Sequence, residues 1–427
     1  MHMPPRSGST SILTGDRGRL AEIVWQRLKP ERWPVPPTDL PKGSVLVGGA
    51  VRDALLDRLS DAPDLDLVVP GNALESTRQL AKKLGGAYVV LDEHRDMARL
   101  VLRGWTIDFA RQDGETLETD LNRRDYRLNA MALRFHGSPR LVDPTGGLED
   151  LQKARVVAVK EANLQHDPLR LLRGLRLIAE LDMDLDAQTL TMLQRNRSLL
   201  PHAAPERIQA ELLRLVVAPA ADRAIATLLE LQLLKPWTGQ DTSDADEKPL
   251  RVEERSGRLT ERERQQALPL ARLTHLLPDS GLKQLRFSRR QLQRCERLRY
   301  WINRSTSIEG SPSPDALTEE ARLQLHKELE QDLPALILTW PETLQQQWLE
   351  RWRDLQDPLF HPRPPLNGTT LLQAFPISPG PSLGALIQHL SLERAYGRIS
   401  THEEALNAAR SWLSDQAVQT DPNGSCD

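Results

Sequence analysis

The stretch VLVGGAVRDALLDRLSDAPDLDLVVPG, residues 45–71, places two glycines between a short apolar run and a helical segment. It ends in a second apolar run that contains two aspartates, Asp64 and Asp66. A carboxylate in a buried strand is costly unless a cation meets it. The stretch therefore predicts a strand, a turn, a helix and a second strand whose acidic side chains need a positive partner.

The glycine turn is a candidate phosphate site. Gly48 and Gly49 stand where the first strand enters the helix, and glycines there leave backbone N–H groups open to phosphate oxygens. Arg52, in the first helical turn, opposes the helix dipole and therefore calls for an anionic partner. A Gly-Gly turn also occurs as a plain strand-to-helix connection, so its neighbours must decide the interpretation.

The neighbours are carboxylates. Asp64 and Asp66 alternate along a strand, so they share one face of the sheet and repel each other unless a divalent cation neutralises them. Oxygen ligands on a rigid strand suit Mg²⁺. Asp108, in another β-rich run, offers a third carboxylate, with Glu115 and Glu118 as alternatives. Together with the glycine turn, these are the parts needed for two-metal nucleotidyl transfer.

Composition describes an ordinary globular chain. Its 427 residues are 39% hydrophobic and 27% charged, with a net charge of -3. No apolar run is long enough to span a bilayer, and the N-terminus lacks the apolar core of a secretory signal, so we expect a cytoplasmic protein without membrane contact. Cys295 and Cys426 are too few for a disulfide framework or a cysteine zinc site.

The chain changes character near residue 160. Earlier residues alternate short apolar runs with turn residues, whereas later residues are helical in period, as in DPLRLLRGLRLIAELDM. This pattern predicts an α/β head followed by an all-α remainder. The expected strands are 45–47, 65–69, 87–91, 99–102, 106–110, 130–135 and 156–159.

These residues carry a family resemblance. GGAVRDALLDR followed by DLDLVV resembles the class II tRNA nucleotidyltransferase (CCA-adding enzyme) and bacterial poly(A) polymerase family, within the polymerase-β-like nucleotidyltransferases. Further motifs follow in the family's order: LNRRDYRLNAMAL (121–133), LVDPTGGLEDLQKARVV (141–157), HDPLRLLRGLRL (166–177) and PERIQAELLRLV (205–216). A segment near the C-terminus, from PLNGTTLLQAF onward, is similar to the family's tail.

The resemblance implies a fold. We expect a nucleotidyltransferase head with a five-stranded mixed sheet, followed by a helical neck that carries a nucleobase-reading motif, then a helical body and tail. The expected boundaries are 1–40 for an N-terminal extension of unknown role, 41–160 for the head, 161–225 for the neck, 226–345 for the body and 346–427 for the tail.

The resemblance also implies a role for each motif residue. Asp64 and Asp66 would bind Mg²⁺, and Asp108 would act on the 3′-hydroxyl of the RNA primer. The remaining residues would bind the incoming nucleotide: its triphosphate by Gly48, Gly49 and Arg52, its ribose and phosphates by Arg123, Arg124, Asp125 and Asn129, and its base by Asp167 and Arg170, with Arg173 beside them.

Two motif positions depart from the family. Tyr126 replaces a usual Phe, and His166 replaces a usual Glu in the base-reading motif. The second change leaves Asp167 and Arg170 in place but leaves open how the base pocket is shaped. We expect His166 to be a residue at a helix start, not a catalyst.

The implied reaction is template-independent addition of C and A from CTP and ATP to the tRNA 3′ end. Three alternatives stay open: addition of CC only or A only, with a second nucleotidyltransferase completing CCA; poly(A) polymerase activity; and a catalytically silent RNA-binding scaffold. Residues 251–304 hold 14 Lys and Arg against 6 Asp and Glu, which indicates either an RNA-binding surface or a solvated helical face.

Overall fold

The computed structural model describes residues 16–239, 257–305, 314 and 317–420. The chain forms two compact units, Met1–Leu233 and Leu234–Asp427, and every predicted site residue belongs to the first. No helix among the described residues is both long and apolar enough to cross a lipid bilayer.

The first unit is built on a mixed sheet of seven strands in the order β3-β4-β5-β2-β1-β6-β7. The strands are β1 (Val45–Val47), β2 (Leu65–Val69), β3 (Ala87–Asp92), β4 (Met97–Leu102), β5 (Trp105–Arg111), β6 (Ala132–Arg134) and β7 (Arg140–Val142). Strands β2 and β5 are parallel, and the other neighbouring pairs are antiparallel.

The prediction of five strands was wrong. Hairpins β3–β4 and β6–β7 form the two ends of the sheet, and β7 is too short to show an alternating pattern of its own. The expected strand at 156–159 contributes instead to a separate parallel pair of β8 (Arg155–Val156) with β9 (Asp184–Leu185).

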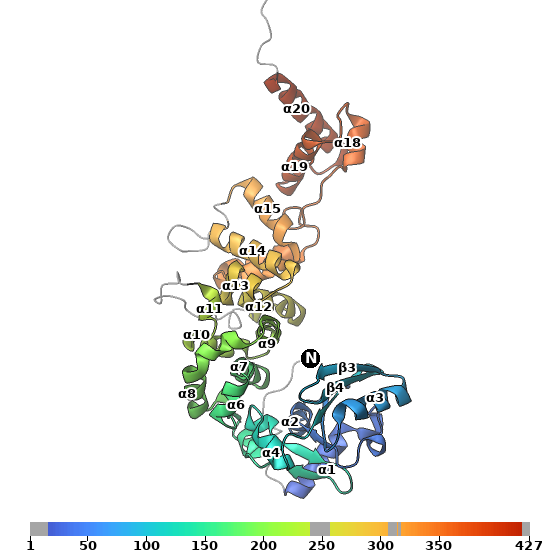
Figure 1. Cartoon of the computed structure of the whole chain (residues 1–427). Coiled ribbons are helices and arrows are strands. Elements are labelled where there is room, and N and C mark those ends of the chain that lie inside the picture. The colour runs from blue at the N-terminus through green and yellow to red at the C-terminus, as the bar shows by residue number, and fades with distance from the viewer. Residues whose placement is uncertain (1–15, 240–256, 306–313, 315–316, 421–427) are drawn as a thin grey trace, which may run out of the picture. The chain divides into compact units, whose positions relative to one another are not determined.

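Different helices cover the two faces of the large sheet. Helix α3 (Ala73–Leu84) packs against β3, β4 and β5, where Leu100 is fully buried (Figure 1). Helix α4 (Leu117–Asn122) packs against the opposite face, over a cluster that includes Val47 of β1. Toward the β3 edge this second face is more open, since Val101 of β4 is 40% exposed.

The N-terminal helix completes the first unit. Helix α1 (Arg17–Leu28) packs against α2 (Gly49–Leu55) and β7. Trp25 stacks on Phe135 with ring centroids 5.4 Å apart, and Trp33 meets the same ring edge-on. The described part of the expected N-terminal extension therefore contributes to the core of this unit; residues 1–15 lie outside the described residues.

Helices follow the sheet, as the sequence pattern predicts. They are α5 (Gly147–Gln152), α6 (Glu161–His166), α7 (Leu169–Leu181), α8 (Ala187–Asn196), α9 (Pro205–Val217) and α10 (Ala221–Glu230). Helices α7, α9 and α10 pack on one another, and Leu172, Leu175 and Ile178 bury the apolar stripe of α7. This stripe leaves the arginines of α7 on another side of the helix.

All described elements of the second unit are helical. They comprise α11 (Lys235–Thr238), α12 (Glu261–Leu276), α13 (Asp279–Gln284), α14 (Arg289–Arg304), α15 (Glu319–Leu329), α16 (Leu333–Ile337), α17 (Glu342–Arg353), α18 (Gly368–Ala374), α19 (Pro381–Ala395) and α20 (His402–Thr420). One core gathers Trp340, Trp348 and Phe360 around the buried ring of His326, and a second joins α18, α19 and α20.

Candidate active site

Strands β2 and β5 bring the predicted carboxylates together. Asp66 and Asp108 are direct partners in the parallel register, so their side chains project from the same face. Asp64 comes just before Leu65, the first residue of β2, and is exposed. The expected position of Asp64 inside the strand is thus displaced to its edge. Glu115 and Glu118, the alternative third carboxylates, are exposed outside the sheet.

Asp66 is costly to ionise. Burial raises the pKa of this carboxyl to about 6; the charge of Arg124 opposes the rise, and the charges of Asp108 and Asp64 add to it. No hydrogen bond to the Asp66 carboxylate is found within the described part of the chain. A half-buried acid without such a partner, next to two further acids, is an environment that favours a bound cation.

The carboxylates fit a hard divalent cation. Asp64 and Asp66 offer oxygen ligands only, which Mg²⁺ prefers. In residues 16–239, 257–305 and 317–420, no group of three or more His, Cys, Asp and Glu is placed to hold one ion. Asp108 instead accepts from Arg99 of β4 through both oxygens, at 2.7 and 2.8 Å. Asp64 and Asp66 are therefore the better placed of the three to hold a metal ion.

Gly48 lies directly against this group. Its φ of 75° and ψ of -137° suit glycine. A Cβ atom at Gly48 would also lie 3.1 Å from the Asp66 Oδ2 atom and 3.7 Å from the nearer guanidinium nitrogen of Arg124. Helix α2 begins at the next residue, Gly49. Glycine here thus leaves free space between the helix start, a carboxylate and an arginine.

Arg52 does not stand free at the turn. Its buried guanidinium donates to both carboxylate oxygens of Asp53 at 2.9 Å and to Asn129 Oδ1 at 2.6 Å. Asn129 closes a short 3₁₀ helix (Arg127–Asn129) of the second motif. In this structure, two residues predicted to contact the nucleotide therefore bind each other and connect the first motif to the second.

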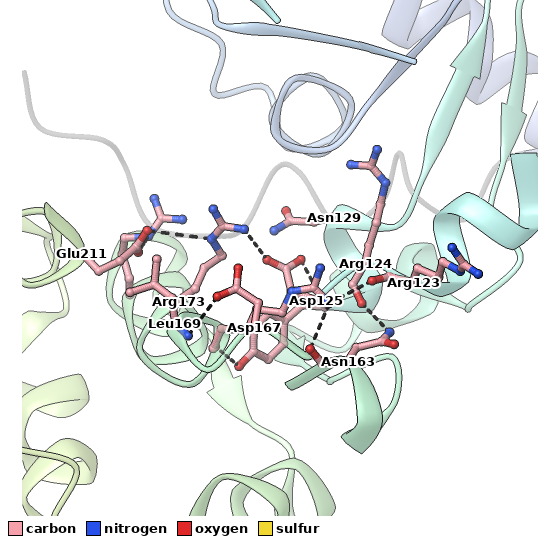
Figure 2. Close-up of polar contacts among 12 residues, drawn as sticks. Arg123, Arg124, Asp125, Asn129, Asn163, Asp167, Leu169, Arg173 and Glu211 are labelled. Atoms are coloured by element: carbon pink, nitrogen blue, oxygen red, sulfur yellow. Dashed lines mark hydrogen bonds and ion pairs between the residues drawn. The ribbon is translucent and has the colours of Figure 1, made fainter. Parts of the chain in front are cut away.

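The Arg-Arg-Asp motif sends its first two side chains in different directions (Figure 2). Arg123 is exposed and pairs with Asp113. Arg124 donates through Nε and Nη2 to the buried carboxylate of Asp120, at 3.3 and 3.2 Å. Because its other Nη atom faces the space beside Gly48, Arg124 is the motif's cation nearest to the carboxylates.

Hydrogen bonds of Asp125 and Tyr126 connect the head to α7. Asp125 Oδ2 accepts from Arg173 at 3.0 Å, and Oδ1 accepts from the Tyr126 amide at 2.8 Å. Burial alone would raise the pKa of Asp125, but the Arg173 charge and these hydrogen bonds hold it below its ordinary value. The Tyr126 hydroxyl donates to the Arg170 backbone carbonyl at 2.8 Å. The same hydroxyl lies against Gly174, where an added Cβ atom would be only 2.1 Å from the hydroxyl oxygen.

The base-reading pair lies at the start of α7. Asp167 accepts hydrogen bonds from Arg207 at 2.9 Å and from the Leu169 backbone amide at 3.3 Å. Burial alone would raise the pKa of Asp167, but the contact with Arg207 lowers it below its ordinary value. Arg170 donates to the backbone carbonyls of Arg123 and Asn163. Both members of the predicted pair are therefore held in place by neighbouring residues.

A cleft of about 1040 Å³ runs between the head and α6–α7. Its lining comes from the β3–β4 turn, the end of β5, the Arg-Arg-Asp motif and the two helices; the predicted residues among them are Arg123, Arg124, Asp125, Arg170 and Arg173. The strand carboxylates are not in its lining. A smaller cavity of about 160 Å³, between α1 and the loop after α2, contains no predicted site residue.

Comparison with known proteins places this geometry in a family. Residues 44–157 match the Poly A polymerase head domain, and residues 182–238 match the probable RNA and SrmB-binding site of polymerase A. The CC-adding tRNA nucleotidyltransferase of Synechocystis is 32% identical over 87% of this chain and 94% of its own length. The chain belongs to the tRNA nucleotidyltransferase family.

Other tRNA nucleotidyltransferases agree with this assignment. The A-adding enzyme of Deinococcus radiodurans is 31% identical over 90% of this chain and 98% of its own length. A structure of the Thermotoga maritima CCA-adding enzyme complexed with tRNA has a TM-score of 0.65, covers 97% of this chain and all of its own, and is 21% identical. The structural likeness shows the shared fold: a polymerase-β-like head with a mixed sheet, followed by helical regions.

Three residues that contact the predicted site residues of this tRNA nucleotidyltransferase were not predicted from the sequence. Arg99 binds Asp108, Arg207 binds Asp167, and the Asn163 amide donates to the backbone carbonyls of Asn122 and Arg124. Arg99 carried one signal, since it is a cation at an alternating position of an apolar strand. Arg207 lies within the motif at 205–216, but Asn163 carried no signal.

His166 has a neighbour on the head. Its Nε2 atom lies 3.5 Å from the guanidinium of Arg95, in the β3–β4 turn, and both residues line the large cleft. The residue that replaces the family's Glu thus faces a cation in this tRNA nucleotidyltransferase.

Proposed function

We propose that this tRNA nucleotidyltransferase transfers cytidylyl groups from CTP to the tRNA 3′ end, and that a second nucleotidyltransferase adds the terminal A. The observation that carries the proposal is the similarity to the Synechocystis CC-adding enzyme over nearly its whole length. Addition of A alone is the second candidate, because the Deinococcus A-adding enzyme matches to a similar extent. Both candidates are halves of CCA synthesis.

The segment between the carboxylate strand and the Arg-Arg-Asp motif supports partial addition. The family resemblance implies that enzymes adding all of CCA and enzymes adding one part of it differ in a mobile element between these two motifs. In this chain, residues 92–121 form β4, β5 and α4 with a short link at 112–116. Two hydrogen bonds hold this link in place: the Gln112 backbone amide donates to the Val69 carbonyl, and the Asp113 backbone amide donates to the Asp120 carboxylate. Little chain is left to reshape the site for a second base.

The proposed reaction is a nucleotidyl transfer. The 3′-oxygen of the tRNA bonds to the α-phosphorus of CTP, the bond from that phosphorus to the β-phosphate bridging oxygen breaks, pyrophosphate leaves, and the hydroxyl proton is released. A divalent cation such as Mg²⁺, held by Asp64 and Asp66, would make the hydroxyl more acidic and neutralise phosphate charge.

The chain's own residues would bind and orient the triphosphate. Gly48 and Gly49 leave room for phosphate oxygens beside the start of α2, and Arg124 adds a positive charge at the same place. Arg52 and Asn129 hold the turn against the second motif through their mutual hydrogen bond. Positioning and charge neutralisation supply most of the catalysis in such transfers.

The base would be read by Asp167 and Arg170. A carboxylate and a guanidinium together accept from and donate to the base edge of C. Arg207 keeps the Asp167 carboxylate ionised and oriented, while the carbonyls of Arg123 and Asn163 orient Arg170. We propose that this support fixes the pair for one kind of base.

The second unit would contact the tRNA backbone. Residues 257–304 of the basic stretch lie largely on α12, α13 and α14; residues 251–256 lie outside the described residues. Arg289, Arg290 and Arg297 are exposed on α14. Such side chains supply phosphate contacts that depend on salt and not on base sequence.

Primer extension tests the proposal directly. Purified protein with Mg²⁺ receives tRNA transcripts that end before CCA, after C and after CC, with CTP, ATP or both. We expect two C residues on the first transcript, one on the second and none on the third. Addition of A to the third transcript alone would establish an A-adding enzyme instead. Extension of the first transcript by CCA would overturn the proposal of partial addition. The Asp64→Ala variant is the inactive control.

A further inference from the structure

Arg99 is a cation beside the carboxylates that no motif of the sequence explains. Its Nε donates to Asp108 Oδ1 at 2.7 Å and its second guanidinium nitrogen to Asp108 Oδ2 at 2.8 Å. This two-point geometry is the strong form of the arginine–carboxylate pair. Among the described residues, neither side chain makes another hydrogen bond or ion pair.

The register of the sheet explains why the two side chains meet. Arg99 lies opposite Asp108 of β5 and opposite Val89 of β3, and Asp108 lies opposite Asp66 of β2. One row across four strands therefore reads valine, arginine, aspartate, aspartate on a single face. The valine offers Arg99 no acceptor, so its polar neighbour in the row is Asp108.

The charge of Arg99 also reaches the other two acids. Its pKa is raised first by the hydrogen bond to Asp108, and also by the charges of Asp108, Asp64 and Asp66. The side chain is 41% exposed, on the part of the face that α4 leaves open. Arg99 is therefore a direct partner of Asp108 and a weaker counter-charge for Asp64 and Asp66; at Asp66, Arg124 and Arg173 are the leading positive charges.

We propose that Arg99 is a positioning residue for nucleotidyl transfer: it holds Asp108 by both oxygens beside Asp64 and Asp66, and sets how strongly the group attracts a divalent cation. The inference rests on the proposed function. Each oxygen of Asp108 keeps a lone pair for the reacting hydroxyl while the carboxylate is prevented from rotating.

Loss of Arg99 would have two separable effects. Without the guanidinium, Asp108 loses its fixed orientation, which lowers kcat. The carboxylate group also becomes more negative, which raises its affinity for a divalent cation. Lysine at this position keeps the charge but cannot bind two oxygens in the fixed fork of arginine, so it restores the affinity and not the orientation.

The test compares Arg99→Met, Arg99→Lys and Asp108→Asn in the full chain. Mn²⁺ binding is measured by electron paramagnetic resonance without nucleotide or RNA, and kcat and KM for CTP by primer extension. Lys82→Met on α3 removes the same charge from the opposite side of the sheet and is the matched control. Circular dichroism checks that each variant folds.

We expect Arg99→Met to bind Mn²⁺ at least about threefold more tightly while its kcat falls about tenfold or more with little change in KM. Arg99→Lys should match wild type in Mn²⁺ affinity but retain a reduced kcat. The double variant of Arg99→Met with Asp108→Asn should lose no more kcat than Asp108→Asn alone.

Two results would overturn the inference: unchanged kcat and Mn²⁺ affinity in Arg99→Met, or kcat losses that multiply in the double variant. Should wild type show no transfer, the proposed function has failed, and the Mn²⁺ affinities still decide whether Arg99 balances the carboxylates.

Discussion

Two aspartates of the first unit, Asp66 and Asp125, are both shielded from water, but they differ in their hydrogen bonds and in the direction of their pKa shift. Asp125 is 4% exposed and uses both oxygens for hydrogen bonds, from Arg173 and from the Tyr126 amide, so its pKa is lowered. Asp66 has no hydrogen-bond donor in the described residues, and its pKa is raised to about 6. One carboxylate accepts hydrogen bonds at both oxygens, whereas the other accepts none from the described residues.

The contrast separates architecture from chemistry within one set of motifs. A carboxylate that accepts from two elements of the chain connects them, and here Asp125 joins the head to α7. A carboxylate kept costly by burial and by neighbouring acids is held ready for a cation. We therefore expect mutation of Asp66 to harm activity, and mutation of Asp125 to harm stability as well as the predicted contact with the nucleotide.

The largest effect is expected at Asp66. The Asp66→Ala variant should lose transfer activity by about a thousandfold or more, since a bound metal ion, for which Asp66 is a proposed ligand, would supply several kcal/mol of transition-state stabilisation. Primer extension with CTP measures this loss. Asp61→Ala, at an exposed acid of the preceding loop, should keep its activity. Equal losses of activity in Asp66→Ala and Asp61→Ala would contradict a special role of Asp66 in the transfer.

At Asp125 we expect a loss of stability. The Asp125→Asn variant leaves the Arg173 guanidinium with Glu211, 3.9 Å away, as its one remaining charged partner among the described residues, and should destabilise the junction of head and α7 by about 3 kcal/mol. Hydrogen exchange of the α7 amides under increasing urea measures the change. The additional substitution Arg173→Met should recover part of the loss, because it removes a charge that Asp125 no longer balances, while Glu211 keeps its ion pair with Arg176. A variant as stable as wild type would contradict the assignment of Asp125 as a structural residue.

The pH dependence of stability should have the sign set by the raised pKa of Asp66. Well below pH 4 the carboxyl holds its proton in both the folded and unfolded states. Between about pH 4 and 6 the unfolded chain releases the proton while the folded protein keeps it, so stability falls, and above about pH 6 the loss is complete. In metal-free buffer at pH 8, Asp66→Asn should therefore be more stable than wild type by about 1–2 kcal/mol. The two proteins should converge as the pH falls below about 4.

Thermal unfolding with a chelator, over a series of pH values, checks this prediction. Mg²⁺ should then stabilise wild type and leave the Asn variant nearly unchanged. A wild type that is the more stable protein at pH 8 without metal would reverse the sign and refute the account of Asp66.

The smallest effect concerns the hydroxyl group beside Asp125. The Tyr126→Phe variant loses the bond to the Arg170 carbonyl and should cost about 1 kcal/mol with activity retained, as Phe is the expected family residue. Tyr88 provides the matched control, because its buried hydroxyl has no partner among the described residues. Tyr88→Phe should be neutral or slightly stabilising by urea denaturation, and an equal cost at both positions would argue against the Tyr126 bond.

Much of the site followed from local patterns. The Gly48-Gly49 pair predicts a tight strand-to-helix turn, and the structure has it. Of the two alternating aspartates, Asp66 lies within β2 as predicted, whereas Asp64 lies just before it. The roles assigned to these residues stay predictions until the variants are measured. The sequence pattern predicted β1 to β6 of the sheet, although the resemblance implied five strands; only β7 was missed, since it is too short to carry a pattern.

The sequence by itself determined the order of elements, the apolar stripe of α7 and the family, because these depend on periodicity and on motifs contiguous in the chain. Only the tertiary structure decided the partners of the charged residues. Asp125 meets Arg173 across 48 positions, and Arg52 meets Asn129 across 77. Arg99 meets Asp108 because β4 and β5 pair in one register, and a shift by one residue would send the two side chains to opposite faces. Which acid is paired and which is left open is therefore set by register and packing, which no local stretch encodes.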